Sequence, residues 1–162
     1  MTTSFIMTPD LAAVDQPPAD EAAIRNDGFF PDIDPAQVRE DGRISSMMSA
    51  PRLRAAIVAA IMTVAQDLKA FAAASLEAGH ATLGDVPAPQ LDGQSVQLIR
   101  YQRAVVLYAK AELIERYRDF DTTNAGGKQG DDLSPAIGEL RRDALYAVRD
   151  MLGKSRTTID LI

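Results

Sequence analysis

The strongest constraint on the fold is that apolar residues recur at helical spacing in three long stretches of the chain. The first stretch begins near Ser49 or Ala50, carries Pro51 in its first turn and is followed by Gly79, which can end a helix in the left-handed conformation. Its apolar residues are spaced four, four, three, four and three apart, at Leu53, Ile57, Ile61, Val64, Leu68 and Phe71. This spacing predicts one amphipathic helix with a single buried stripe.

The second stretch runs from about Gln94 to Phe120, and Asp92 or Ser95 can cap it. Its apolar residues cover more than one face, at Val96, Ile99, Tyr101, Val105, Val106, Tyr108, Ala109, Leu113, Ile114 and Tyr117. A helix with apolar residues on more than one face packs on two sides, so we predict that this helix is central.

The third stretch runs from roughly Ser134 to Leu152, with Pro135 in its first turn and Gly153 after its end. Its inner face carries Ile137, Leu140, Ala144, Leu145, Val148 and Met151. A short helix is predicted upstream, where Asp34 can cap, Pro35 can take the first helical position and Gly42 can end it. Three apolar residues would anchor this piece to the body: Phe29, Phe30 and Ile33.

The segments between the long helices are rich in glycine and proline. The linker His80–Gly93 should be turn or extended chain, and the composition of Asp121–Asp132 predicts a loop. No stretch alternates in polarity long enough to build a sheet. We therefore predict an all-α fold: a helical bundle of three long helices plus a short N-terminal helix, with extended N- and C-terminal arms. Residues 1–27 would be an extended or disordered arm, 28–153 the bundle domain, and 154–162 a tail that is strand-like if it meets a sheet edge.

Composition excludes several function classes. With 162 residues and 46% hydrophobic residues the chain suits a single domain. The absence of cysteine excludes disulfides, thiolate nucleophiles and cysteine-based metal sites. The 23 acidic residues outnumber the 17 basic ones, and a formal charge of -6 argues against a protein that holds nucleic acid by neutralising phosphates.

No membrane or export signal is expected. The longest apolar run, Ala55–Ala65, is well short of the roughly 20 residues that a spanning helix needs. No Lys or Arg precedes Arg25, so a signal peptide would lack its positive n-region. We therefore expect the protein to remain where it is made, without contact with a membrane.

Candidate chemical groups have simpler structural interpretations. His80 is the only histidine and follows Gly79 at a helix end, where histidine meets terminal carbonyls. Ala125–Gly130 reads AGGKQG but lacks the spacing of a phosphate-binding loop. The acidic pairs Asp32/Asp34 and Asp131/Asp132 precede predicted helices, where carboxylates cap amides more often than they bind Mg²⁺ or Ca²⁺. We predict no enzymatic activity, no cofactor and no metal.

The densest polar cluster is ERYRDFDTT, Glu115–Thr123, at the end of the predicted central helix. Glu112 lies four residues before Arg116, and Glu115 three before Arg118, so pairs can form along the helix. The cluster is either a solvated, ion-paired helix end or a junction with a neighbouring element or subunit. In the second case the counterpart charges are on the third helix, and we name Asp119 and Arg142 as one specific pair. The candidate counterparts are Arg141, Arg142 and Asp143.

From Phe29 onward the chain resembles the head completion protein family (the gpL type) of temperate tailed bacteriophages with contractile tails. The matching segments are FFPDID at Phe29–Asp34, DG at Asp41 and Gly42, RLRAAI at Arg52–Ile57, GHATLGDVPA at Gly79–Ala88, RAVVLYAKAELIERYRDFDTT at Arg103–Thr123, LRRDA at Leu140–Ala144 and RTTIDLI at Arg156–Ile162. The ERYRDFDTT segment together with the C-terminal pattern is specific. The first 27 residues match nothing in this pattern.

The resemblance implies a structural adaptor of the virion's head-tail connector, assembled in the cytoplasm of the bacterial host. Such proteins bind below the portal as a ring of about twelve subunits after DNA packaging, extend the DNA channel and receive the next neck or tail-terminator protein. Packaged DNA would pass through the ring without sequence-specific binding. By analogy with related adaptors, portal docking is expected from Arg156, Thr157, Thr158, Ile159, Asp160, Leu161 and Ile162.

Two further sets of residues follow from the implied ring. Contacts between subunits or helices are expected from Arg116, Tyr117, Arg118, Asp119, Phe120, Asp121, Arg141 and Arg142. The loop that lines the channel or meets the next neck protein would include Asn124, Gly126, Gly127, Lys128 and Gly130. Two alternatives stay open: a helical regulator that binds a protein partner without forming rings, and a DNA-packaging accessory subunit whose DNA binding would depend steeply on salt.

Overall fold

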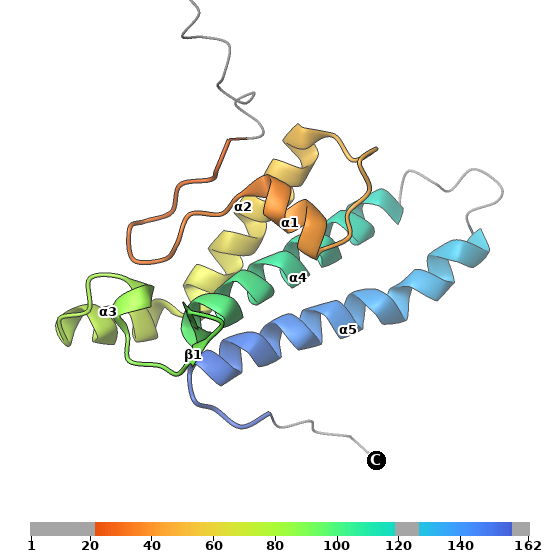
Figure 1. The fold of residues 1–162 in the computed structure, drawn as a ribbon. Helices are drawn as coiled ribbons and strands as arrows, with labels where there is room; N and C mark the ends of the chain where they lie inside the picture. The colour runs from red at the N-terminus through yellow and green to blue at the C-terminus, as the bar shows by residue number, and fades with distance from the viewer. Residues whose placement is uncertain (1–21, 119–126, 157–162) are drawn as a thin grey trace, which may run out of the picture.

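The computed structural model describes residues 22–118 and 127–156, and for residues 117–118 and 127–135 it describes the backbone alone. Within these ranges the chain is mostly helical, with one two-stranded sheet (Figure 1). The elements are α1 (Pro35–Asp41), α2 (Ala50–Asp67), α3 (Lys69–Glu77), the 3-10 turn η2 (Leu83–Asp85), β1 (Gln90–Leu91), β2 (Gln94–Ser95), α4 (Val96–Arg118) and α5 (Gly127–Met151). The prediction of a mainly α fold is confirmed.

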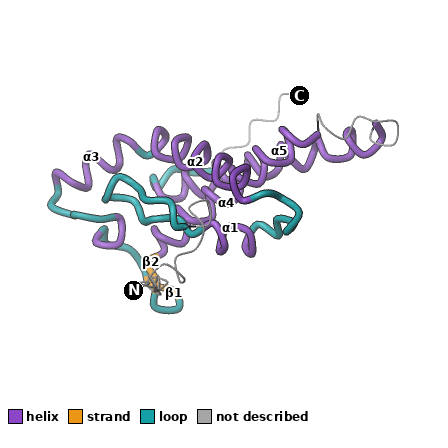
Figure 2. Tube along the Cα trace, turned by 90° about the horizontal axis from the view of Figure 1, so that it is seen from above, coloured by secondary structure: helices purple, strands orange, loops and turns teal. Residues whose placement is uncertain are grey.

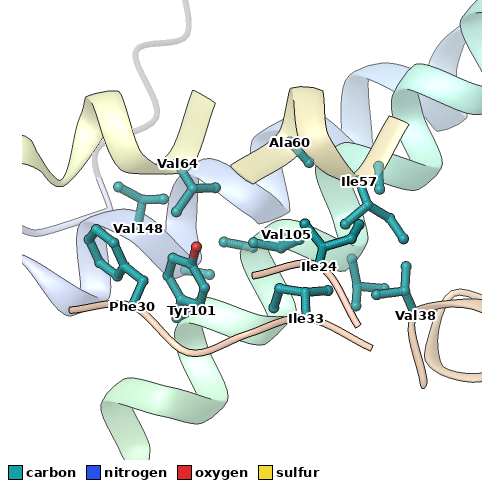
Figure 3. Close-up of a cluster of buried hydrophobic side chains, with 14 of the residues drawn as sticks. Ile24, Phe30, Ile33, Val38, Ile57, Ala60, Val64, Tyr101, Val105 and Val148 are labelled. Carbon is teal, nitrogen blue, oxygen red and sulfur yellow. The ribbon is translucent and has the colours of Figure 1, made fainter. Parts of the chain in front are cut away.

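Helix α4 is central, as its two-sided apolar pattern predicts, because both α2 and α5 pack against it. Helices α4 and α5 run antiparallel: Gln97 near the start of α4 donates a hydrogen bond from Nε2 to the carbonyl oxygen of Met151 at the end of α5, at 3.5 Å. The core around α4 is closed to solvent, since Ile57 of α2 and Val105 of α4 are fully buried (Figure 3). Burying one such side chain stabilises the fold by about 1.5–3 kcal/mol.

The segment before α1 is pinned to the core. Ile24 and Ile33 exchange backbone hydrogen bonds of 2.7 and 3.0 Å as an isolated antiparallel bridge. Phe30 stacks on the ring of Tyr101 with centroids 4.8 Å apart and an interplanar angle of 9° (Figure 3). Asn26 donates from Nδ2 to the Tyr101 hydroxyl at 2.8 Å. The predicted anchoring role of the apolar residues between 29 and 33 is therefore confirmed.

Helix α1 begins and ends as predicted. The Asp34 carboxylate accepts a hydrogen bond from the backbone N–H of Ala36 at 2.8 Å, and Pro35 is the first helical residue. Gly42 is the C-cap in an ordinary right-handed conformation, so glycine is required there because a side chain would not fit, not because of the backbone angles. A Cβ there would lie 2.8 Å from the carbonyl oxygen of Val38.

The single helix expected from Ser49 to Gly79 is wrong in one respect, because it is broken into α2 and α3 at Leu68 with a bend of 62°. Leu68 is fully buried while Asp67 and Lys69 beside it are exposed. Neither glycine nor proline marks the bend. The burial of Leu68 accompanies the turn of the chain, so tertiary packing decided it. Helix α3 lies at the opposite end of the molecule from the start of α5 (Figures 1 and 2).

The linker after α3 carries more regular structure than its composition suggests. It contains η2 and the hairpin β1–β2, in which Gln90 pairs with Ser95 and Leu91 with Gln94. The hairpin turn is Asp92-Gly93, both in the left-handed region at φ 49° and 74°. Two left-handed residues are what a two-residue hairpin of this kind requires. The expectation of no sheet is therefore wrong at this one short hairpin. Ser95 also accepts the Gln97 N–H at 3.3 Å and so caps α4, as anticipated.

Helix α5 begins at Gly127, seven residues before the predicted start at Ser134. The expectation of a loop throughout Asp121–Asp132 is thus wrong for its second half. Glycine lowers helix stability by only about 1 kcal/mol, and Lys and Gln are good helix formers, so the composition of GKQGDD permits helix without favouring it. Pro135 stands inside α5, where the chain lacks one backbone N–H for the helix ladder. Residues 121–126 lie outside the described residues.

Both predicted arms fall largely outside the described residues. Of residues 1–27, the structure describes only the last six, and these are extended and attached to the body. Of the tail 154–162, it describes residues 154–156. The proposed division into arm, bundle and tail stays a prediction.

Candidate functional site

The polar end of the α4–α5 pair is the first of three candidate surfaces. Arg116 Nε lies 2.7 Å from Glu112 Oε1, which is the pair that their spacing predicts. Glu115 instead reaches across to α5, where Arg141 Nη2 lies 2.5 Å from its Oε2. Both side chains of this inter-helix pair are about half exposed, at 48% and 47%. Arg141 of α5 thus pairs with Glu115 of α4 within one chain, and the assignment of these residues to contacts with a neighbouring subunit stays a prediction.

The other residues predicted for this end are only partly placed. Arg142 and Asp143 are neighbours on α5, with Nε and Oδ1 3.6 Å apart. Tyr117 and Arg118 form the last turn of α4, and only their backbone is described. Asp119, Phe120 and Asp121 lie outside the described residues, so the named pair of Asp119 with Arg142 stays a prediction.

A groove of about 290 Å³ opens where α2, α4 and α5 meet. Its lining combines small or apolar side chains with the charged rim just described: Ala59, Ala60, Thr63, Tyr108, Glu112 and Arg141. The Tyr108 ring is half-buried, and burial first, then the charge of Asp67, raises the pKa of its hydroxyl, while Arg141 acts in the opposite direction. The groove therefore has an apolar floor and an ion-paired edge, which suits contact with a protein segment.

Apolar side chains next to the groove remain exposed on the outer side of α2. Val58 is 40% exposed and Met62 is 67% exposed. The helical spacing of apolar residues predicted only the inner stripe of this helix. The signal that could have revealed the outer one is the apolar run Ala55–Ala65, which fills both faces of the helix instead of one. An exposed second apolar stripe indicates a contact surface.

The root of the C-terminal tail is the second candidate surface. After Gly153, at φ 64°, the chain turns back beside the last turn of α5, and the Lys154 N–H donates to the Arg149 carbonyl at 2.9 Å. Arg149 Nε donates to the carbonyl oxygen of Ser155 at 2.9 Å. These bonds set the direction in which the tail leaves the helix.

Arg156 is fastened to α5 by its guanidinium. Its Nε donates to Asp150 Oδ1 at 3.0 Å, its Nη2 contacts Asp150 Oδ2, and its charge lies 5.5 Å from the centre of the Tyr146 ring. The hydrogen bond from Arg156 is the main reason that the pKa of the Asp150 carboxyl is lowered, with further contributions from the charges of Arg100 and Arg103. The remaining residues predicted for docking, Thr157–Ile162, lie outside the described residues.

The third candidate surface is the loop expected to line the channel, and the structure shows that part of it is helical. Gly127, Lys128 and Gly130 belong to the first turns of α5. Asn124 and Gly126 lie outside the described residues. The predicted loop is therefore a shorter connection followed directly by helix.

The sequence motifs with possible chemistry have structural roles where the structure describes them. Asp34 caps α1, and Asp32 accepts the backbone N–H of Asn26 at 2.9 Å. The backbone N–H of His80 donates to the Ser75 carbonyl at 3.0 Å, at the end of α3. Over residues 22–118 and 127–156, no group of three or more His, Cys, Asp or Glu side chains is arranged to hold a metal ion.

Hydropathy adds one observation about α2 and α3. No single helix in the described part of the chain combines the length and apolar content needed to cross a bilayer. Helices α2 and α3 taken together have that length and apolar content, but a bend of 62° separates them. Part of the apolar content of this pair is the exposed apolar side of α2, at Val58 and Met62.

Comparison with known proteins finds similarity over nearly the whole chain. Residues 24–162 match the family described as Phage head completion protein (GPL). The "Head completion/stabilization protein" of Escherichia phage P2 is 40% identical over 149 residues, covering 92% of this chain and 88% of that protein. The "Probable head completion/stabilization protein" of Haemophilus phage HP1 (strain HP1c1) is 26% identical over 143 residues, covering 88% of this chain and 94% of that protein. No solved structure matches significantly.

Proposed function

This chain belongs to the phage head completion protein family, and from that premise we propose that it is a ring-forming adaptor that binds below the portal. Membership establishes a structural, non-enzymatic role in completing or stabilising the head, and so a component of the virion. The finer proposal is that copies join as a ring after DNA packaging, extend the channel and offer a surface to the next neck or tail-terminator protein.

The observation that carries the proposal is the extent of the family match, from residue 24 to the last residue. It includes the buried core, the polar end of α4–α5 and the tail, so the surfaces with no use in folding are within the matched part. A closed ring needs two different faces on each subunit. The exposed stripe of α2 and the charged end of α4–α5 supply surfaces of different chemistry.

We assign portal docking to Arg156–Ile162. The tail root supports this assignment, because Arg149 and Asp150 hold Ser155 and Arg156 in one direction before the chain leaves the body. A tail presented in a fixed direction loses less freedom on binding, and an extended segment can add to an exposed strand edge of a partner. A chain ending at Gly153 should then lose co-assembly with the portal while its helices remain folded.

Ring contacts are assigned to the polar end of α4–α5: Arg116, Tyr117, Arg118, Asp119, Phe120, Asp121, Arg141 and Arg142. Because Glu115 and Arg141 are half exposed, a neighbouring subunit could cover their pair without first breaking it. Burial by a neighbour would strengthen the attraction between the two charges, which the contact must set against the cost of removing them from water. The connection between α4 and α5, with Asn124 and Gly126 followed by the first turn of α5, is assigned to the channel or to the next neck protein.

The experiment is removal of this gene from its phage, followed by electron microscopy of the lysate. DNA-filled heads that lose their DNA or fail to join tails are expected, and the intact gene supplied from a plasmid should restore virions. The same plasmid ending at Gly153 tests the docking tail and should not restore them. Normal virions in the absence of the gene would refute the adaptor function, whereas restoration by the truncated gene would refute any need for residues 154–162 and leave the adaptor function standing.

A further inference from the structure

Basic side chains gather where α4 begins and α5 ends, although the chain as a whole is acidic. Arg100 Nη1 donates to the carbonyl oxygen of Asp150 at 3.1 Å, and Arg103 lies on the same side of α4, one turn further along. The last turn of α5 and the residues after it add Arg149, Lys154 and Arg156. We call these five residues the basic surface.

The basic surface carries an excess of charge that the fold does not neutralise. Arg100, Arg103 and Arg156 act on the carboxylate of Asp150, and Arg149 and Lys154 are close to it in the chain. Five cations against this one carboxylate leave a formal excess of four positive charges. The next acidic residue along α5, Asp143, is beside Arg142, which offsets it. Arg103 and Lys154 are exposed. Clustered exposed charges of one sign repel each other, so such a surface is better suited to an acidic partner than to solvent.

Acidic residues without basic ones are concentrated in residues 1–21. This segment contains Asp10, Asp15, Asp20 and Glu21 and neither Lys nor Arg, so it holds four of the six net negative charges of the chain. The remaining 141 residues have a formal charge of only -2. The charge of the segment equals the excess on the basic surface with opposite sign.

The attachment point of this segment is distant from the basic surface of the same copy. The segment joins the body at Ala22, whose carbonyl oxygen accepts a 2.7 Å hydrogen bond from Arg54 in the second turn of α2. In Figure 1 this point is at the upper side of the molecule, and α5 ends at the lower side. Complementary surfaces at opposite sides of one subunit permit head-to-tail contacts, which close into a ring when the rotation from copy to copy closes.

We propose that the basic surface of one copy binds the acidic segment Asp10–Glu21 of the next copy in the ring. The inference rests on the proposed ring function and gives it one specific contact between subunits. Asp10 is 12 residues from Ala22 and can lie at most about 40 Å from it, whereas Glu21 is its direct neighbour. The contact therefore requires the basic surface of the next copy to lie close to Ala22.

A second group of arginines, near α1 and the start of α2, is less suitable as the docking surface. Arg39 donates to the carbonyl oxygens of Ser45 and Met48, and Arg54 to that of Ala22. These guanidinium groups hold loop backbone in place. The basic surface differs because Arg103 and Lys154 are exposed, and the carboxylate near Arg103, Asp150, is already paired with Arg156.

The first test measures binding of a labelled synthetic peptide of residues 1–21 to the full-length protein by fluorescence anisotropy. The protein carries Asp10→Asn, Asp15→Asn, Asp20→Asn and Glu21→Gln, so that its own segment does not compete. Adding Arg103→Glu and Lys154→Glu should weaken peptide binding about tenfold or more. The matched control, Arg43→Glu with Lys69→Glu, makes the same charge change at exposed positions elsewhere and should weaken it less than about threefold.

The outcomes separate the alternatives. No binding of the peptide, or equal weakening by both pairs of substitutions, would overturn the proposal. Tighter binding of a 20-base-pair DNA duplex, lost with the same Arg103 and Lys154 substitutions, would reassign the basic surface to DNA. None of these measurements uses phage assembly, so their failure leaves the gene-removal result unaffected.

The second test asks whether the contact joins two copies. The full-length protein with the neutral segment and the full-length protein with Arg103→Glu and Lys154→Glu each lack one half of the contact. Sedimentation at low salt should show association only when the two are mixed, and it should stop at pairs. Absence of pairing in the mixture, with the peptide still bound in the first test, would place the contact within one copy and refute the contact between subunits.

Discussion

The two halves of α4 differ in what surrounds them. In the first half, Tyr101 and Val105 are fully buried, and Tyr101 is held by the ring of Phe30 and the amide of Asn26. In the second half, Glu115 and Arg116 face outward and pair with charges rather than with apolar side chains. Ala109 and Leu113 are buried in the second half as well, so the difference is that its outward side adds ion pairs with α4 and α5 charges. Substitutions in the two halves should therefore act on different measurements.

Tyr101→Ala should have the largest effect on stability. It removes a fully buried ring and its stack on Phe30, and should lower the free energy of unfolding by about 3–5 kcal/mol. Urea denaturation followed by circular dichroism measures this. Tyr101→Phe keeps the ring and should cost about 1 kcal/mol, mainly because the Asn26 amide loses one of its two acceptors and keeps the Pro31 carbonyl oxygen. Equal losses in the two variants would show that the hydrogen bond, not the packing, stabilises this half of α4.

Alkaline pH should reveal the same burial. Burial raises the pKa of Tyr101 to about 12, although the hydrogen bond from Asn26 acts to lower it. Because the pKa is raised in the folded state, stability is complete below the unfolded value near 10 and falls between pH 10 and about 12, by about 2 kcal/mol. Urea midpoints measured across this range should decline less in Tyr101→Phe. The same decline in both proteins would mean that other groups cause it.

Asp34→Ala tests how far the stability depends on the N-terminal piece that covers the first half of α4. The substitution removes the cap on the Ala36 N–H and should lower the free energy of unfolding by about 1 kcal/mol. Glu40→Ala, at an exposed position of the same helix, is the control and should change it by less than about 0.5 kcal/mol. If the two variants lose equal stability, the cap does not support this region.

The pair of Glu115 with Arg141 should have the smallest effect on the free protein. Both side chains are about half exposed, so a double-mutant cycle with Glu115→Ala and Arg141→Ala should give a coupling of about 0–1 kcal/mol. Co-assembly of the same variants with portal particles should fall clearly if the polar end of α4–α5 joins subunits. A large coupling in the free protein combined with normal assembly would reverse the contrast between the two halves of α4.

Much of the fold could be predicted from local patterns. The cap at Asp34, the first helical position of Pro35 and the central place of α4 each follow from residue type or spacing, and the structure has all three. Asp92-Gly93 is a dipeptide typical of hairpin turns, although only turn or extended chain was predicted for this linker. The break at Leu68 had no local signal, because neither glycine nor proline interrupts α2 and α3.

The candidate surfaces were predictable in part. Spacing along one helix correctly pairs Glu112 with Arg116, since neighbours on a helix are set by its period. The same rule suggests Arg118 for Glu115, but the structure places Arg141 of α5 there. The groove between α2, α4 and α5 likewise exists only because three helices meet.

By itself, the sequence determined the helical class, the buried stripes, the local caps and the family, because each depends on residues close together in the chain or on their order. Only the tertiary structure decided which charges from separate helices meet and which apolar residues stay exposed, as at Met62. It also decided that Arg100 and Arg103 of α4 and Arg156, which follows α5, lie close to Asp150. These features depend on how the helices pack around α4, and packing brings together residues whose separation in the chain carries no signal.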